Sequence, residues 1–153
     1  MILDIDDNPP IFKNTPYKVN VAENQPENTI IFDMIEAYDM DGPLYNKFTF
    51  SLAVKQNEDE HFSIDKTNNL DSGHYSTSIM LKKKLDYQIS KTHVVTILAT
   101  GENSAFTTST ELFVNVIDIP DKPPEFSQSP YYVKIDEELP VVSIKLTLAF
   151  EFN

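Results

Sequence analysis

The sequence contains no cysteine and no tryptophan, and it has only three glycines in 153 residues. Without cysteine, disulfide bonds, thiolate metal sites and a cysteine nucleophile are all excluded. No apolar run approaches the ~18–20 residues that a membrane-spanning helix requires. Residues 1–20 also lack the basic and apolar regions of a signal peptide, so we expect either a cytosolic protein or an interior piece of a longer one.

Basic residues are scarce as well. The chain carries 12 Lys and Arg against 24 Asp and Glu, which gives a formal net charge of -12 and a pI near 4.5. Because the phosphate backbone of nucleic acids attracts basic surfaces, this balance argues against nucleic acid as a partner. Hydrophobic residues make up 41% of the chain and aromatic residues 11%, which is too apolar for a disordered acidic tail. We therefore expect a folded core.

The chain repeats itself at a spacing of 114 residues. When residues 2–26 are aligned with residues 116–140, eleven of 25 positions are identical, and most of the identical residues are Asp, Pro or aromatic. Internal similarity at a fixed spacing is the signature of tandem modules. We predict a linker from a preceding module at 1–11, one complete module at 12–118, a second linker at 119–125 and the truncated start of the next module at 126–153.

The complete module has the pattern of a β protein. Apolar and polar residues alternate in four segments, and a fifth segment alternates less regularly. The five expected strands are 17–21, 30–37, 48–52, 95–99 and 112–116. Clusters of Asn, Asp, Gly and Pro separate them, and with so few glycines the turns must rely on Asn and Asp. Six or seven strands in a module of this length predict an all-β fold, namely a seven-strand, antiparallel Greek-key β-sandwich of the immunoglobulin type.

Aspartates gather beside the predicted turns and strand ends. They form the clusters Asp4-Ile-Asp-Asp-Asn8, Asp39-Met-Asp41 and Asp118-Ile-Pro-Asp121, together with Asp86. Carboxylates brought this close repel one another, so such clusters oppose folding unless a cation lies among them. A single Asp in a turn is more often a turn former, but a repeated cluster of oxygen ligands without Cys selects a hard cation. Ca²⁺ accepts six to eight oxygens at loose geometry, and Mg²⁺ tolerates such a cage less well.

Residues 4–12, Asp-Ile-Asp-Asp-Asn-Pro-Pro-Ile-Phe, resemble the DxNDNxPxF linker of extracellular cadherin repeats. Further matches to the family follow in the same order along the chain: Val21-Ala-Glu23, Asp39-Met-Asp41, Asn46 before the 48–52 strand, Leu85-Asp86-Tyr87-Gln88 in place of LDRE, and the second linker at 118–126. The long 66–84 segment resembles non-classical, protocadherin-like members more than classical ones. The resemblance to the cadherin superfamily covers almost the whole chain, and it implies an immunoglobulin-like cadherin repeat.

The resemblance implies that Ca²⁺ ions bind at both junctions between repeats and stiffen the string of modules. At the N-terminal junction the implied ligands are the carboxylates of Asp4, Asp6, Asp7, Asp39 and Asp41 and the main-chain oxygens of Asn8 and Asn46. At the C-terminal junction they are Glu23, Asp86, Asp118, Asp121 and the carbonyl of Ile119. Glu137, the counterpart of Glu23 in the next repeat, is a further implied ligand.

Several positions depart from the family pattern. Pro120 stands where the family has a ligating Asn, Lys122 adds a positive charge, and Gln88 offers only a neutral oxygen. We therefore expect one or two ions at the second junction rather than three. At the first junction Gly101 removes an expected carboxylate, for which the adjacent Glu102 is a candidate substitute.

The resemblance implies a fragment of a calcium-dependent cell-adhesion receptor ectodomain, which is the extracellular portion of a single-pass plasma-membrane protein. The implied partners are other cadherin-type ectodomains and the adjacent repeats of the same chain, with no membrane contact by this segment. The alternative is a non-adhesive, ligand-binding or force-bearing receptor that uses the same calcium sites. We do not expect an enzyme, because His61, His74 and His93 read as isolated surface residues and no triad motif accompanies them. The Asp39/Asp41 pair is better explained by metal binding than by glycoside hydrolysis.

Overall fold

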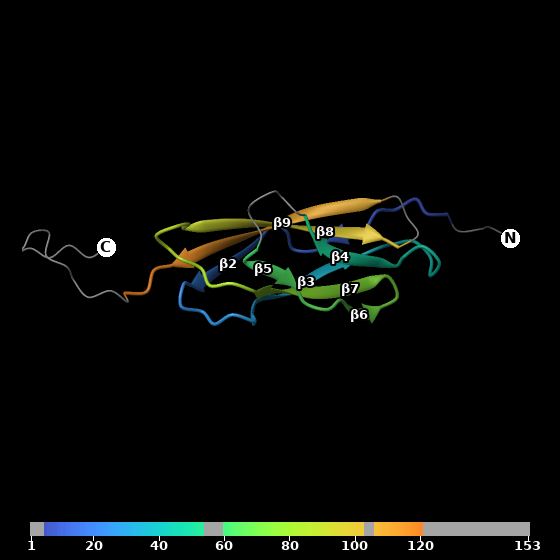
Figure 1. Cartoon of the computed structure of the whole chain (residues 1–153). Coiled ribbons are helices and arrows are strands. Elements are labelled where there is room, and N and C mark those ends of the chain that lie inside the picture. The colour runs from blue at the N-terminus through green and yellow to red at the C-terminus, as the bar shows by residue number, and fades with distance from the viewer. Residues whose placement is uncertain (1–4, 54–59, 103–105, 121–153) are drawn as a thin grey trace, which may run out of the picture. The chain divides into compact units, whose positions relative to one another are not determined.

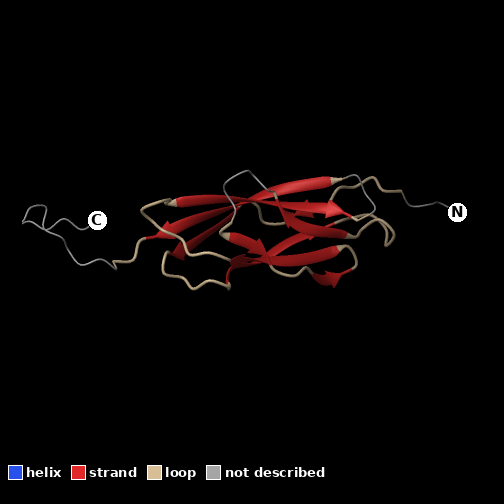
Figure 2. Ribbon diagram, in the orientation of Figure 1, coloured by secondary structure: helices blue, strands red, loops and turns tan. Residues whose placement is uncertain are grey.

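The computed structural model describes residues 5–53, 60–102 and 106–120. These residues form nine β-strands and no helix (Figures 1 and 2). The strands are β1 (Ile11–Phe12), β2 (Tyr17–Ala22), β3 (Thr29–Tyr38), β4 (Phe48–Leu52), β5 (Phe62–Ile64), β6 (Asn68–Asp71), β7 (His74–Leu81), β8 (Thr92–Gly101) and β9 (Thr107–Ile117). The chain divides into two compact units, Met1–Ile119 and Pro120–Asn153, and all nine strands belong to the first.

The strands form two sheets that pack face to face (Figure 1). One sheet has the order β1-β3-β7-β5, with β6 paired to β7, and the other has the order β2-β9-β8-β4. Consecutive strands such as β2 and β3, or β4 and β5, lie in different sheets, so the chain crosses repeatedly between the two layers. The predicted all-β sandwich is confirmed.

The N-terminal strand changes sheets, which the sequence did not reveal. β1 pairs antiparallel with β3, with Phe12 opposite Ala37, whereas β2 pairs parallel with β9 along its whole length. Pro16 lies between the two segments, and its lack of an N–H prevents it from donating to a sheet ladder. The sandwich is therefore antiparallel except at the β2–β9 pair, and the divided first strand is one reason why the described residues hold nine strands instead of seven.

The 66–84 segment is not a long loop but contains the β6–β7 hairpin. β7 pairs with β3, β5 and β6, and its Thr77, Ile79 and Leu81 are buried in alternation with partly exposed residues. This period-two pattern is visible in the sequence, but serines and threonine make it weakly hydrophobic. Sheet pairing and burial, rather than side-chain hydrophobicity alone, decide that this segment is a central strand.

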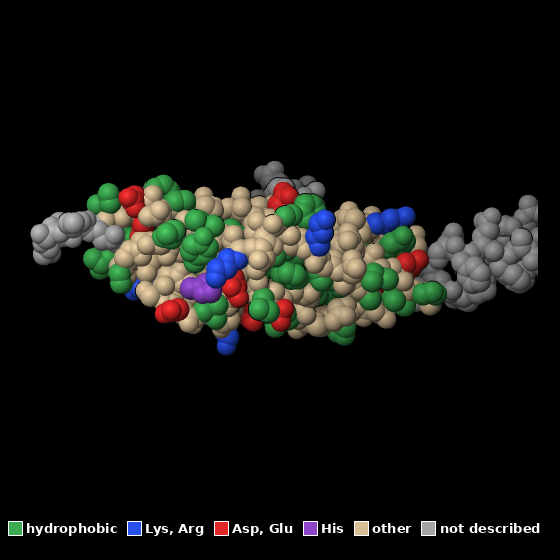
Figure 3. Space-filling view, turned by 180° about the vertical axis from the view of Figure 1, so that it is seen from behind, with side chains coloured by type: hydrophobic (Ala, Val, Ile, Leu, Met, Phe, Trp, Pro, Cys, Tyr) green, Lys and Arg blue, Asp and Glu red, His purple; other side chains and the backbone are tan. Residues whose placement is uncertain are grey.

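The core lies between the sheets and is built from the inward-facing residues of both. Its aromatic members touch at favourable tilted geometry, with the ring of Phe48 centred 5.5 Å from Phe50 and 4.8 Å from Tyr75. The buried hydrophobic residues are Tyr17, Val21, Ile35, Ala37, Phe48, Phe50, Phe62, Ile79, Leu81, Leu85, Val95, Ile97, Ala99, Leu112, Val114 and Val116. On the outer face in Figure 3, hydrophobic side chains are interspersed with acidic, lysine and other polar groups.

Asparagine supplies backbone conformations for which the chain has few glycines. Asn14 and Asn28 adopt positive φ angles of 56° and 62°, and Gly73 adopts 71° at the β6–β7 turn. Asn tolerates the left-handed region better than most residues with a side chain. The expectation that turns rely on Asn is thus met at these two positions.

Removing a core side chain from β7 should destabilise the module strongly. Ile79 is 0% exposed whereas Ile89, in the loop after β7, is 84% exposed. Truncation of the buried residue loses apolar contacts and leaves a cavity, so we expect Ile79→Ala to lower the free energy of unfolding by about 2–5 kcal/mol. The matched variant Ile89→Ala should change it by less than about 0.5 kcal/mol. Chemical denaturation of both variants tests this, and equal effects would contradict the assigned core.

Candidate metal centre at the ends of the module

A loop after β3 buries polar side chains at the N-terminal end of the sandwich. Asp39 and Asp41 are each 7% exposed, and Asn46, just before β4, is 5% exposed. Acidic residues are seldom buried to this extent unless they are paired, because removing a carboxylate from water is costly. Asp39 Oδ1 accepts a hydrogen bond of 2.9 Å from the main-chain N–H of Asp41, which fixes the turn between them.

The β6–β7 turn holds this loop in place. The main-chain N–H of Asp39 donates to the carbonyl of Gly73 at 2.8 Å, and the side-chain amide of Asn46 donates to Ser72 Oγ at 3.0 Å. A Cβ atom added at Gly73 would lie 2.6 Å from the carbonyl oxygen of Asp39, which is closer than van der Waals contact allows. The close approach and the positive φ together require glycine at this position. Sequence analysis did not identify this supporting turn.

The N-terminal linker lies against the same loop. The side-chain amide of Asn8 donates to Asp41 Oδ1 at 2.5 Å and to Asp7 Oδ1 at 2.7 Å, and its main-chain N–H donates to Asp41 Oδ2 at 3.3 Å. Oδ1 of Asp6 is buried and has no hydrogen-bond partner among the described residues. A buried carboxylate oxygen without a donor is costly, and a cation is one group that would satisfy it.

The carboxylates at this end influence one another's protonation. Burial raises the pKa of Asp39, and the charges of Asp41 and Asp6 raise it further, against the lowering effect of the Asp41 main-chain hydrogen bond. Hydrogen bonds from Asn8 lower the pKa of Asp41, which favours its charged form. The predicted metal ligands here are all oxygen atoms, which suit a hard cation. Within the described ranges, however, no three Asp, Glu or His side chains are already gathered closely enough to hold a metal ion.

At the opposite end of the sandwich, Glu23 joins three segments. Its carboxylate accepts hydrogen bonds from the main-chain N–H groups of Tyr87 at 3.0 Å and Ile119 at 2.9 Å. Its own main-chain N–H donates to Ile117 at 3.1 Å. Glu23 follows β2, Tyr87 lies in the loop before β8 and Ile119 follows β9, so one side chain connects the ends of β2 and β9 with that loop.

The other predicted ligands at this end are only partly placed. Asp86 is exposed, and its Oδ1 accepts from the main-chain N–H groups of Gln88 at 2.8 Å and Ile89 at 3.3 Å, which shapes a turn. Asp118 and Ile119 follow β9 directly. Asp4, Asp121 and Glu137 lie outside the described residues.

Gly101, the position of the missing carboxylate, is the last residue of β8 and is buried opposite Phe48. The next residue, Glu102, is exposed, and its main-chain N–H donates to Lys47 at 2.8 Å. Glu102 therefore lies next to the Asn46 end of the module. Whether its carboxylate replaces the missing one stays a prediction.

The three histidines are not the isolated surface residues that the sequence indicated. His74 Nε2 lies 3.2 Å from Glu36 Oε2 on the neighbouring strand β3, and 3.1 Å from Nζ of Lys13, which follows β1. The rings of His61 and His93 are centred 5.5 Å apart. Each histidine is partly buried. The sequence could not show these contacts because the partners lie far apart along the chain.

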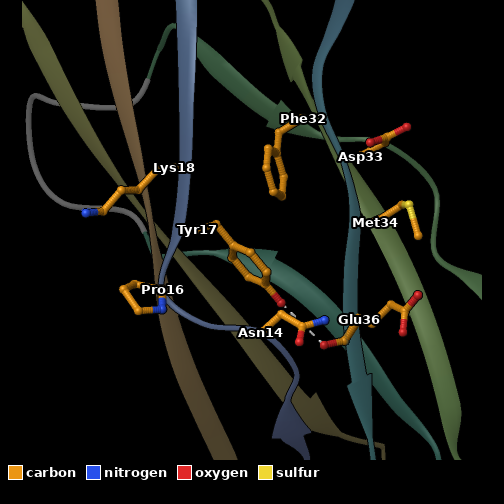
Figure 4. Close-up of a pocket in the computed structure, with 8 residues that line it drawn as sticks. All are labelled: Asn14, Pro16, Tyr17, Lys18, Phe32, Asp33, Met34 and Glu36. Carbon is orange, nitrogen blue, oxygen red and sulfur yellow. Dashed lines mark hydrogen bonds between the residues drawn. The ribbon is translucent and has the colours of Figure 1, made fainter.

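A separate pocket of about 420 Å³ opens where β2 and β3 diverge (Figure 4). The ring of Tyr17 packs against Phe32 with centroids 5.3 Å apart, and the Tyr17 hydroxyl donates to the carbonyl of Lys13 at 2.7 Å. Burial raises the pKa of Tyr17. The pocket is lined by Asn14, Pro16, Tyr17, Lys18, Phe32, Asp33, Met34 and Glu36. None of the predicted metal ligands is among them.

The chain belongs to the cadherin family. A family model described as "Cadherin domain" matches residues 17–117, which spans β2 to β9. The module is therefore a cadherin repeat, as its linker motifs indicated. The family comprises adhesion receptors rather than enzymes, which confirms the prediction of a non-enzymatic module.

The relatives include cadherin-related proteins and protocadherins. Cadherin-related family member 1 of Xenopus laevis is 33% identical over 157 residues, covering 97% of this chain and 17% of the relative. The Gallus gallus protein of the same name is 35% identical, covering 90% and 16%. The solved structure of protocadherin gamma C5 EC1-3 matches with a TM-score of 0.72 at 26% identity, covering 97% of this chain and 46% of that one. The chain thus spans about a sixth of the length of these curated relatives.

No helix among the described residues is long and apolar enough to cross a membrane.

The three-way contact of Glu23 should contribute measurably to stability. Glu23→Ala leaves the N–H groups of Tyr87 and Ile119 without their acceptor, so we expect the free energy of unfolding to fall by about 1–3 kcal/mol. Glu27 is a matched control, because its carboxylate is exposed and its contact with the main-chain N–H of Lys84 is long, at 3.4 Å. Glu27→Ala should be nearly neutral in the same urea titration. A Glu23→Ala variant as stable as the wild type would show that this contact is not structural.

The raised pKa of Asp39 predicts a pH dependence of stability in the absence of divalent ions. Because the folded state holds this proton more tightly than the unfolded state, the stability contributed by Asp39 is greatest at low pH. It decreases as pH rises from the ordinary carboxyl pKa of about 4 through the raised value. Asn cannot ionise but can still accept the Asp41 hydrogen bond. Asp39→Asn should therefore gain stability relative to the wild type across this range in EDTA, and parallel profiles for the two proteins would contradict the assignment.

Proposed function

We propose that this cadherin repeat is part of a calcium-dependent cell-adhesion receptor ectodomain, in which Ca²⁺ bound at both ends of the repeat stiffens the rod of modules. The observation that carries the proposal is the buried Asp39, Asp41 and Asn46 set beside the linker, where Asp6 has a buried oxygen that finds no partner in the described part of the chain. A folded protein tolerates such a cluster best when a cation compensates its charge.

The proposed ligands at the N-terminal end are the carboxylates of Asp4, Asp6, Asp7, Asp39 and Asp41 with the main-chain oxygens of Asn8 and Asn46. Those at the C-terminal end are Glu23, Asp86, Asp118, Asp121 and the carbonyl of Ile119. Glu137 is proposed to play the part of Glu23 in the next repeat. Bound Ca²⁺ supplies positive charge that neutralises these groups and joins segments from adjoining modules. Because ligands from two modules share the same ions, the hinge between the modules is removed.

The linker positions give the proposed domain organisation. Residues 12–118 form the repeat, residues 1–11 and 119–125 form the linkers, and residues 126–153 belong to the following repeat. The proposed location is the extracellular portion of a single-pass plasma-membrane protein. Its proposed partners are cadherin-type ectodomains of the same or another protein, because the solved neighbours include protocadherin ectodomains of several repeats.

Calcium should stabilise a chain that contains this repeat with both of its neighbours. A ligand that binds only the folded form contributes about 2.7 kcal/mol at a hundredfold excess over its dissociation constant, so the unfolding temperature should rise with Ca²⁺. Asp41→Ala removes a ligand from the N-terminal site only, so it should reduce that rise and leave the part that comes from the C-terminal site. Asp33→Ala is the matched control, because Asp33 is an exposed acid on β3 that belongs to neither linker cluster. Thermal unfolding with Ca²⁺ and with EDTA gives the measurement, and identical curves for the wild type would overturn the metal site.

Adhesion is tested separately from metal binding. Beads coated with the complete ectodomain should aggregate in Ca²⁺ and disperse in EDTA. Calcium-dependent stabilisation without bead aggregation would support the alternative, a receptor whose calcium sites serve only to stiffen it.

A further inference from the structure

Two histidines from opposite sheets meet at one edge of the sandwich. His61 precedes β5 and His93 lies in β8, and their ring centroids are 5.5 Å apart with the planes inclined by 53°. Phe62, which is buried, packs its ring edge-on against His93 with centroids 5.5 Å apart. This packing defines where the His93 ring lies. The pair therefore connects the β5 sheet to the β8 sheet.

Among the described residues, β4 pairs with only part of β8. β4 covers β8 from Ile97 to Gly101, and the hydrogen bond from Ala53 to the carbonyl of Thr96 extends the contact by one residue. His93 lies farther along β8, beyond the reach of β4. Side chains two apart on a strand share a face, so His93 lies on the inward face that also carries the buried Val95. The two imidazoles thus lie beside the part of β8 with which β4 does not pair.

The separation of the rings fits a shared metal ion. Two imidazoles that ligate one tetrahedral Zn²⁺ through nitrogens at about 2.0–2.1 Å place their ring centroids about 5 Å apart. The observed 5.5 Å is within a small side-chain adjustment of that value. Imidazole nitrogen suits Zn²⁺, Cu²⁺ and Ni²⁺, whereas Ca²⁺ takes oxygen ligands. The pair therefore differs in chemistry from the carboxylate clusters at the module ends.

The surroundings of His61 orient one of its nitrogens. His61 Nδ1 lies 3.5 Å from the carbonyl oxygen of Lys83. Because a carbonyl oxygen only accepts, Nδ1 carries the hydrogen in this contact and Nε2 is the ring nitrogen without one. Metal-ligating histidines commonly donate their second ring N–H to a carbonyl in this way. The described charges nearby are those of Lys82, Lys83 and Glu60, and Lys83 and Glu60 form an ion pair with each other. The positive charge of Lys83 is thus compensated locally rather than directed at the imidazoles.

We propose that His61 and His93 bind a borderline divalent metal ion of the Zn²⁺ class, with water completing the coordination, and that this ion links the two sheets. The site is independent of the proposed calcium sites. Binding an ion that holds β5 to β8 would stabilise the folded module, because the unfolded chain does not hold the two rings together.

The test uses the full 153-residue chain with Zn²⁺ as the probe and excess Ca²⁺ present to occupy oxygen sites. We expect Zn²⁺ to raise the unfolding temperature by about 5 °C once it exceeds its dissociation constant a hundredfold. The His61 and His93 ring signals should shift together in an NMR titration. His61→Phe and His93→Phe retain an aromatic ring without a ligating nitrogen, so each should fold and should lose the Zn²⁺ effect.

The third histidine provides the matched control. His74 lies against Glu36 and Lys13 on another part of the sandwich, so His74→Gln should keep the full response to Zn²⁺. The proposal is overturned if Zn²⁺ leaves the wild type unchanged, if both Phe variants respond like the wild type, or if His74→Gln alone removes the response. Since Ca²⁺ is in excess throughout, failure of this test leaves the calcium proposal unaffected, and failure of the calcium test leaves this one standing.

Discussion

The burial of carboxylates, to which repulsion between them adds, is the constraint on which the N-terminal end of this module depends. Asp39 and Asp41 are almost fully buried, and the charges of Asp41 and Asp6 oppose ionisation of Asp39. Hydrogen bonds from Asn8 favour the charged form of Asp41 and so offset part of the cost. Unless a cation is present, the other stabilising contacts of the fold must offset the remaining free-energy cost of burying these carboxylates. This is why the linker and the loop form one structural unit.

The packed sheets offset that free-energy cost because they hold both ends of the module in place. β2 and β9 run parallel along their shared length. Both strands end where the Glu23 carboxylate accepts its main-chain hydrogen bonds. The other end is supported by the β6–β7 turn, where only glycine allows Asp39 and Asn46 to approach so closely. Paired strands thus connect the two acidic ends of the module.

Different ligand chemistries are separated within one small fold. Oxygen donors gather where chain segments turn at the ends of the sandwich, while the imidazole pair lies between the sheets where β4 stops short. The separation of oxygen ligands from imidazole ligands follows from topology. Loops at strand ends expose main-chain carbonyls and short Asp side chains, whereas the sheet edge brings together the larger imidazole rings. A hard cation and a borderline cation would therefore select different places without competing.

Local pattern determined much of this protein from the sequence alone: the repeat, the linker motifs, the β periodicity of 48–52 and the acidic character of both junctions. The family followed from those motifs and is confirmed by the match over residues 17–117. Tertiary structure alone decided that β1 and β2 belong to different sheets, that β7 is a central strand, that Gly73 supports Asp39, and that His61 meets His93. Those features depend on contacts between residues distant in the chain, and neither periodicity nor composition carries that information.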